Sequence, residues 1–320
     1  MKNRSIILLL AVLATLVIVV IIWDFMSKRP DRSSQNPWEY NVDEFKKLDD
    51  SLLIKYNETR RIKLDSTLLH GIAFHNNKIY ILSDEYLQVI SPEGTEYIRK
   101  KLMDSPRCIT VSDNHLYIGY MDHIASYDLD GNLEATWDTL GPKAVLTSLA
   151  VMDDLLFAAD AGNRRILRYK INGELLGQFE GKSESGQLHG FIIPSPSFDL
   201  AVNQFGELWV VNPGKHALEH YSYDGRLLGY WDNASFDIEG FSGCCNPAQI
   251  AILADGSFVT AEKGMVRIKV HKASGELIAV VAPTEKFKEA FNAPDLALSP
   301  DGVVYALDID SRMIRVFQHN

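Results

Sequence analysis

The chain has 320 residues, of which 46% are hydrophobic and 23% charged, so it can bury a substantial core. Its formal net charge of −10 argues against a nucleic-acid-binding protein, which needs a basic surface to displace counterions from phosphate. Nucleic acid is therefore not among the expected partners.

The chain begins with an apolar segment. Lys2 and Arg4 precede residues 6–22, which carry no charge, and Trp23 follows them. This run is close to the length that a bilayer core requires, and neither a small-residue cleavage site nor a lipid-acceptor cysteine follows it. We expect an uncleaved signal anchor over residues 1–26 that crosses a membrane once, with a cleaved signal peptide as the alternative. The basic N-terminus favours placing the rest outside the cytoplasm, in a periplasm or at the cell surface.

A polar linker is expected next, over residues 27–52. It leads to residues 53–64, which read LIKYNETRRIKL and have the composition of a β-strand.

Six copies of one pattern follow. Each begins with a short apolar run that contains a small residue, then has a polar turn and further short strands separated by hairpin turns. No helical pattern intervenes. Repeated four-stranded units of this kind are typical of propeller blades. The sequence therefore predicts an all-β, six-bladed β-propeller, whose blades begin near residues 69, 106, 146, 197, 247 and 293.

The last repeat is incomplete, because the chain ends at Asn320 directly after its third strand. We expect residues 53–64 to supply the missing strand, which would close the ring and leave no open sheet edge. The predicted propeller domain thus covers residues 53–320.

Two segments resemble NHL repeats: LFAADAGNRRILRYKING at residues 156–173 and VVYALDIDSRMIRVF at residues 303–317. The resemblance extends over all six units and implies a six-bladed propeller. The NHL family includes lyases, protein-binding and RNA-binding modules and sensor domains, so it does not imply one function. GCCNP at residues 243–247 is similar to a loop of uncharacterised membrane-anchored NHL proteins of bacteria, which implies a functional loop but no activity.

The turns after the second and fourth strands of every blade should lie on one face of the disc, which we call the top face. The longest connections, residues 181–197, 233–247 and 284–294, belong to it, and long loops on a rigid scaffold often carry binding sites. Cys244 and Cys245 lie in the second of these connections.

Three interpretations of the cysteine pair are open. Adjacent cysteines can form a strained vicinal disulfide. They can also bind a soft metal such as Cu or Zn, with Cys108 of the opposite blade as a third sulfur ligand. Alternatively, the loop is a compact turn in which both side chains pack as small hydrophobic groups.

Other polar residues are expected on the same face. Glu262 occupies a repeated position at the end of the second strand, which favours a structural role, and Arg164 lies in a turn that is either solvated or binds an anion. The candidate ligand-binding residues of the top face are Cys244, Cys245, Asn246, His70, Arg107, Arg164, His189, His216 and Glu262.

The sequence contains no nucleophile elbow, phosphate loop or dinucleotide fingerprint, so no catalytic residue is assigned. Our first hypothesis is a membrane-anchored binding or sensor module that takes a protein or a small molecule at the top face. One alternative, which the NHL resemblance implies, is a metal-dependent lyase or hydrolase with Ca or Zn. The other is a redox or copper-handling protein that uses the cysteine pair.

Overall fold

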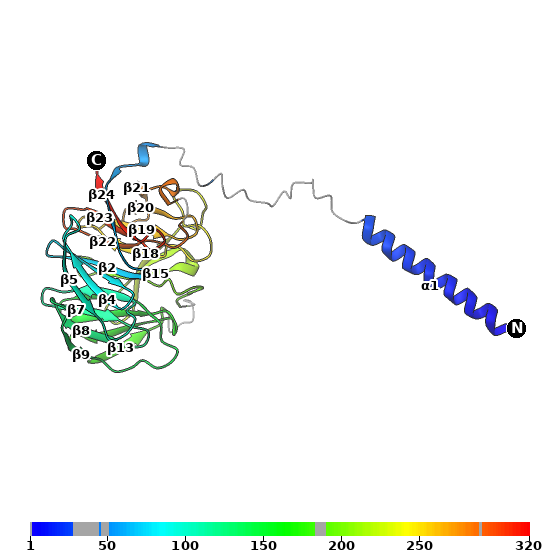
Figure 1. Cartoon of the computed structure of the whole chain (residues 1–320), viewed down its shortest axis with the longest axis horizontal. Coiled ribbons are helices and arrows are strands. Elements are labelled where there is room, and N and C mark those ends of the chain that lie inside the picture. The colour runs from blue at the N-terminus through cyan, green and yellow to red at the C-terminus, as the bar shows by residue number, and fades with distance from the viewer. Residues whose placement is uncertain (1, 28–44, 46–50, 183–189, 288–289) are drawn as a thin grey trace. The chain divides into compact units, whose positions relative to one another are not determined.

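The computed structural model describes residues 2–27, 45, 51–182, 190–287 and 290–320 (Figure 1). The chain divides into two compact units, Met1–Val42 and Asp43–Asn320. His189 and most of the predicted linker lie outside the described residues.

The first unit contains helix α1 (Lys2–Ser27). Its sequence has no glycine or proline, the two residues that most disfavour a helix interior. Among the described residues, however, no helix combines the length and the apolar character that crossing a membrane requires. The predicted membrane-spanning helix is therefore not supported.

The second unit is a ring of six four-stranded antiparallel sheets, so the predicted all-β six-bladed propeller is confirmed (Figure 1). In blades 1–5 the strands follow chain order, from the first strand to the outer fourth strand. Blades 1–3 contain β2 (Leu69–His75), β3 (Lys78–Ser83), β4 (Tyr86–Ile90) and β5 (Glu96–Lys101); β6 (Cys108–Val111), β7 (His115–Gly119), β8 (Ile124–Asp128) and β9 (Leu133–Thr136); and β10 (Leu146–Met152), β11 (Leu155–Asp160), β12 (Arg165–Lys170) and β13 (Leu175–Phe179). Blades 4 and 5 contain β14 (Leu200–Val202), β15 (Leu208–Asn212), β16 (Ala217–Tyr221) and β17 (Leu227–Asp232); and β18 (Gln249–Ile252), β19 (Phe258–Glu262), β20 (Arg267–His271) and β21 (Leu277–Ala282).

Blade 6 is built from both ends of this unit. It contains β22 (Asp295–Leu298), β23 (Val304–Asp308) and β24 (Met313–His319), and its outer strand is β1 (Tyr56–Lys63). The two outer strands are antiparallel and pair from Tyr56 with His319 to Lys63 with Met313. The ring is thus closed by β1, which lies within the predicted closing region, residues 53–64. The 3₁₀ turn η1 (Ser51–Leu53) precedes this strand. Two further 3₁₀ turns lie in connections, η2 (Pro213–Lys215) and η3 (Thr284–Phe287).

Apolar side chains fill the spaces between blades. Ile62 and Tyr305 of blade 6 pack with Leu69 and Ile81 of blade 1 in one buried cluster. Farther from the axis the spaces widen and aromatic rings occupy them. The ring of Trp137 lies between those of Tyr117 in blade 2 and Tyr169 in blade 3, with centroids 5.8 and 5.1 Å away. Small residues remain at the centre, where the first strands converge on the axis: Ala73, Thr110, Ala150, Ala201, Ala251 and Ala297.

A buried ionic network joins the closing strand to the rest of blade 6. Arg315 in β24 donates from Nε to Asp308 Oδ2 at 2.7 Å and from Nη1 to Glu58 Oε1 at 3.1 Å. All three side chains are at most 6% exposed. Since Glu58 lies in β1 and Asp308 ends β23, one guanidinium holds three strands of the blade together.

Replacing Arg315 by Met should lower the free energy of unfolding by about 3 kcal/mol, because two buried carboxylates lose their shared cation. Arg61 offers a matched control, since it also pairs with Glu58, at 2.6 Å, but its side chain is 54% exposed. Arg61→Met should cost less than about 1 kcal/mol. Urea unfolding of the full-length protein measures both. Equal losses in the two variants would show that the buried network does not secure the closing strand.

Candidate functional site

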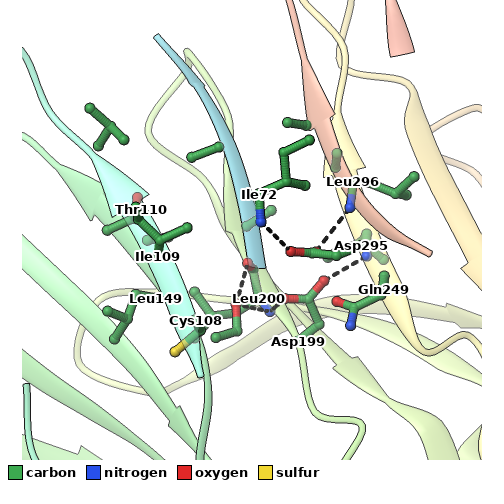
Figure 2. Close-up of a pocket in the computed structure, with 18 of the residues that line it drawn as sticks. Ile72, Cys108, Ile109, Thr110, Leu149, Asp199, Leu200, Gln249, Asp295 and Leu296 are labelled. Carbon is green, nitrogen blue, oxygen red and sulfur yellow. Dashed lines mark hydrogen bonds between the residues drawn. The ribbon is translucent and has the colours of Figure 1, made fainter. Parts of the chain in front are cut away.

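The first strands of all six blades enclose a central cavity of about 300 Å³ (Figure 2). This volume is at the lower end of those observed for small-molecule sites. Every first strand enters from the top face, because it follows the fourth strand of the preceding blade. Residues at the start of each strand therefore surround the top end of the cavity, and residues such as Phe74, Val202 and Leu298 line its other end.

Polar groups gather at the top end. The repeated position at which each apolar run starts is occupied by Gly71, Cys108, Ser148, Asp199, Gln249 and Asp295, and His70 and Arg107 precede it in the first two blades. The cavity is thus polar at its mouth and apolar at its opposite end.

Two carboxyl groups of this ring connect neighbouring blades. Asp199 accepts hydrogen bonds from the backbone N–H of Leu200 at 2.9 Å and of Ile250 at 2.7 Å, which joins blade 4 to blade 5. Asp295 accepts from Leu296 and from Ile72, both at 2.9 Å, which joins blade 6 to blade 1. Figure 2 shows the two carboxyl groups lying near each other beside Gln249.

Both carboxyl groups are weaker acids than usual. Burial raises the pKa of Asp199 to about 6, although the backbone N–H donors and Ser148 oppose the shift. Burial and the charge of Asp199 raise the pKa of Asp295 to about 7. Near neutral pH each group can therefore exist as a protonated donor or as an ionised acceptor.

Two basic side chains lie at the same mouth. His70 Nε2 is buried and has no hydrogen-bond partner among the described residues. Burial and the positive charge of Arg107 lower the pKa of His70, so its ring is neutral at pH 7. Arg107 is exposed, and its guanidinium makes no hydrogen bond or ion pair within the part of the chain that the structure describes.

Cys108 also lies in the cavity wall, but its thiol is protected. Burial and the charges of Asp295 and Asp199 raise its pKa far above the usual value, so it stays protonated. Its sulfur faces Gly119 so closely that a Cβ on that glycine would come within 2.5 Å.

The structure does not bring Cys108 to the cysteine pair. In the described residues, no three His, Cys, Asp or Glu side chains gather in a group that could hold a metal ion. The predicted metal set of Cys244, Cys245 and Cys108 is therefore not assembled, because Cys108 packs inside the cavity wall and the pair lies in a loop outside it.

The cysteine loop does lie on the top face. Asn246 donates to the backbone oxygens of Ser242 at 2.7 Å and Lys263 at 3.0 Å, and it accepts from Lys263 N at 2.9 Å. Lys263 belongs to the turn after the second strand of blade 5, so the loop and that turn share a face. His216 Nδ1 lies 3.1 Å from the carbonyl oxygen of Asn246. Asn246 and His216 thus hold the loop and do not line the cavity.

The other candidates have structural positions as well. Glu262 is fully buried and accepts hydrogen bonds from Ser242 N at 2.9 Å and Arg267 Nε at 2.6 Å, with Lys269 Nζ 2.9 Å away. Arg164 is exposed in the turn after β11, where its φ of 54° is left-handed. Of the predicted ligand-binding residues that the structure describes, which leaves out His189, only His70 and Arg107 lie in the cavity wall. Glu262 ends the second strand of its blade. At this repeated position in other blades, Asp160, Asn212 and Asp308 make comparable structural hydrogen bonds.

Sequence reasoning missed Asp199, Gln249 and Asp295. The signal was present in the repeats themselves, where the runs DLAV, QIAI and DLAL begin with a polar residue. Aligning the first position of all six runs would have placed these side chains in one ring.

No protein-family model and no curated protein matches this chain, so membership of the NHL family is not confirmed. Among solved structures, the chain is similar to a streptogramin B lyase, with a TM-score of 0.58 and 11% identity over 82% of this chain and 97% of that one. It is also similar to virginiamycin B lyase from Staphylococcus aureus, with a TM-score of 0.56 and 14% identity over 82% and 99%. A structural genomics protein of unknown function from Bacteroides thetaiotaomicron gives 0.58 and 14% over 82% and 72%. At these identities the similarity establishes the propeller fold alone.

The raised pKa of Asp295 predicts a pH effect on stability. The folded protein favours the protonated carboxyl, so the stabilisation is fully present below about pH 4 and is lost as the pH rises through about 7. In Asp295→Asn this titration is absent, and the free energy of unfolding should fall less between pH 4 and pH 8 than in the wild type.

Asp310 is the matched control for this experiment. Its pKa is lowered by hydrogen bonds from Asn292 and Phe291, which outweigh burial, so it stabilises the fold above its usual pKa and loses this effect as the pH falls. Asp310→Asn should therefore change the pH profile in the opposite direction and below about pH 4, and it should leave the profile between pH 4 and pH 8 like that of the wild type. Urea unfolding at a series of pH values measures both, and a profile of Asp295→Asn parallel to the wild type would contradict the assignment.

Proposed function

We propose that this protein is a binding protein that holds a small polar ligand in the top end of its central cavity. The observation that carries the proposal is a set of ionisable side chains from three blades, Arg107, Asp199 and Asp295, in the wall of one cavity. A cavity on which a few polar groups converge is typical of a small-molecule site. The proposed site is therefore the top end of the cavity, in place of the top-face loops that the sequence indicated.

The charges at the mouth indicate the class of ligand. Arg107, Asp199 and Asp295 belong to blades 2, 4 and 6, so they alternate around the ring. The charges of all three act on the thiol of Cys108, which supports their converging on one region. A positive group on one side and two carboxyls on the other complement a zwitterion. We therefore propose a molecule with an ammonium and a carboxylate group, of the size of an amino acid.

Each end of such a ligand has a defined partner. The carboxylate would accept hydrogen bonds from the Arg107 guanidinium, which has no other partner in the described residues. The ammonium would lie against Asp199 and Asp295, which line the cavity and whose ionised forms a cation favours. Gln249, which also lines the cavity, would hydrogen-bond the groups between the two ends.

The standard free amino acids, tested one at a time by calorimetry on the full-length protein, provide the probes. At least one should bind with one site per chain, and its N-acetyl derivative and its amide should each bind at least about tenfold more weakly, since each has lost one charged group. Arg107→Ala should weaken binding by about tenfold or more. Arg164→Ala, which removes an exposed arginine outside the cavity, should leave it unchanged.

Two results would contradict this proposal. Failure of every free amino acid to bind would exclude the ligand class. Equal effects of Arg107→Ala and Arg164→Ala would exclude the cavity mouth as the binding site.

A second candidate is an enzyme that works in the same cavity. The observation that favours it is the carboxyl pair, because a pKa of about 7 for Asp295 suits proton transfer near neutral pH. The structural similarity to two lyases is compatible with this alternative. Conversion of a bound amino acid, lost in Asp295→Asn while binding persists, would favour the enzyme; binding without conversion would favour the binding protein.

A location outside the cytoplasm and a protein partner at the top face stay predictions from the sequence. The apolar residues 6–22 and the basic residues before them support the location. Protease added to spheroplasts, whose outer membrane has been opened, should digest the propeller and spare a cytoplasmic marker protein. Protection of the propeller in spheroplasts would contradict the predicted location.

A further inference from the structure

Cys244 and Cys245 form a close pair of thiols outside the proposed binding cavity. Neither is in a disulfide, and their sulfur atoms are 2.8 Å apart. Cys244 is exposed and Cys245 is buried. One thiol can therefore meet a reagent from solution, and the other is held directly behind it.

The surrounding loop fixes the pair in place. On one side, Ser242 donates from its backbone N and its hydroxyl to Glu262 at 2.9 and 3.1 Å. On the other side, the hydrogen bonds of Asn246 to Lys263 attach the loop to blade 5. With both flanks attached to a rigid blade, the sulfur atoms remain close, and reaction between them needs little loss of conformational freedom.

The electrostatics describe a resting dithiol that reacts more readily at higher pH. The hydrogen bond with Cys245 is the largest cause that raises the pKa of Cys244, and the positive charge of Lys263 partly opposes it. Cys244 is therefore mostly a thiol at neutral pH, and the reactive thiolate becomes more abundant as the pH rises.

We propose that Cys244 and Cys245 are a thiol–disulfide exchange site that reacts with accessible disulfides, such as low-molecular-weight ones. The Cys244 thiolate attacks one sulfur of the disulfide, forms a mixed disulfide and releases the first thiolate. The Cys245 thiolate then attacks Cys244 Sγ, releases the second thiolate and closes the Cys244–Cys245 bond. The two protons of the cysteines pass to the released thiolates, so one dithiol and one disulfide give one intramolecular disulfide and two thiols.

An aromatic disulfide such as 5,5′-dithiobis(2-nitrobenzoate), added in excess to the reduced full-length protein, tests the proposal. The wild type should release two aromatic thiolates per chain and retain none, and its mass should fall by two hydrogen atoms. Cys245→Ser should release one and retain one as a stable mixed disulfide, whereas Cys244→Ser should react far more slowly because Cys245 is buried. Cys108 is an internal control, because its buried thiol should not react in the folded protein.

A wild type that keeps aromatic groups on both cysteines would show that the pair does not close and would overturn the proposal. A wild type that releases no aromatic thiolate would also overturn it. The mass of the wild type alone tests closure even if a variant does not fold. Neither result bears on amino acid binding, since the pair does not line the cavity.

Discussion

The pairing of β1 with β24 is the interaction on which the rest of the structure depends. It joins residues from opposite ends of the propeller over Tyr56–Lys63 and converts an open array of sheets into a ring. A ring is required for the central cavity, because that cavity needs a wall from every blade. The hydrogen bond from Ile72 N to Asp295 joins blade 6 to blade 1 near the axis, and Arg315 joins β24 to β1 farther out. The two ends of the propeller are therefore connected at two distances from the axis.

Asp199 and Asp295 have two roles in this arrangement. As acceptors of backbone N–H groups from the neighbouring blade, they hold adjacent first strands together. As weak acids at the cavity mouth, they provide the charge and hydrogen-bonding capacity of the proposed site. Burial causes both effects, since it strengthens the hydrogen bonds and disfavours the ionised form. A ligand cation would relieve this cost, so binding and blade packing are linked through the same atoms.

The top face therefore contains two chemically different regions. The cavity mouth gathers ionisable groups from several blades, none of which is an exposed thiol. The cysteine loop is attached to blade 5 through Ser242 and Asn246, and its flanking polar groups are satisfied by the protein. Glu262 shows the difference clearly. Arg267 and Lys269 neutralise its charge, so its carboxylate has no unbalanced charge with which to attract a ligand.

The sequence by itself determined the number of blades, the missing strand of blade 6 and the face on which the cysteine loop lies. These features follow from local periodicity and strand count, which hairpin geometry converts directly into topology. Only the tertiary structure decided which polar residues serve a site. Glu262 and Asp295 both lie at blade positions repeated in the sequence, but one is neutralised by cations of its own blade and the other faces a cavity. That distinction depends on side chains brought together from distant parts of the chain, so no single repeat contains it.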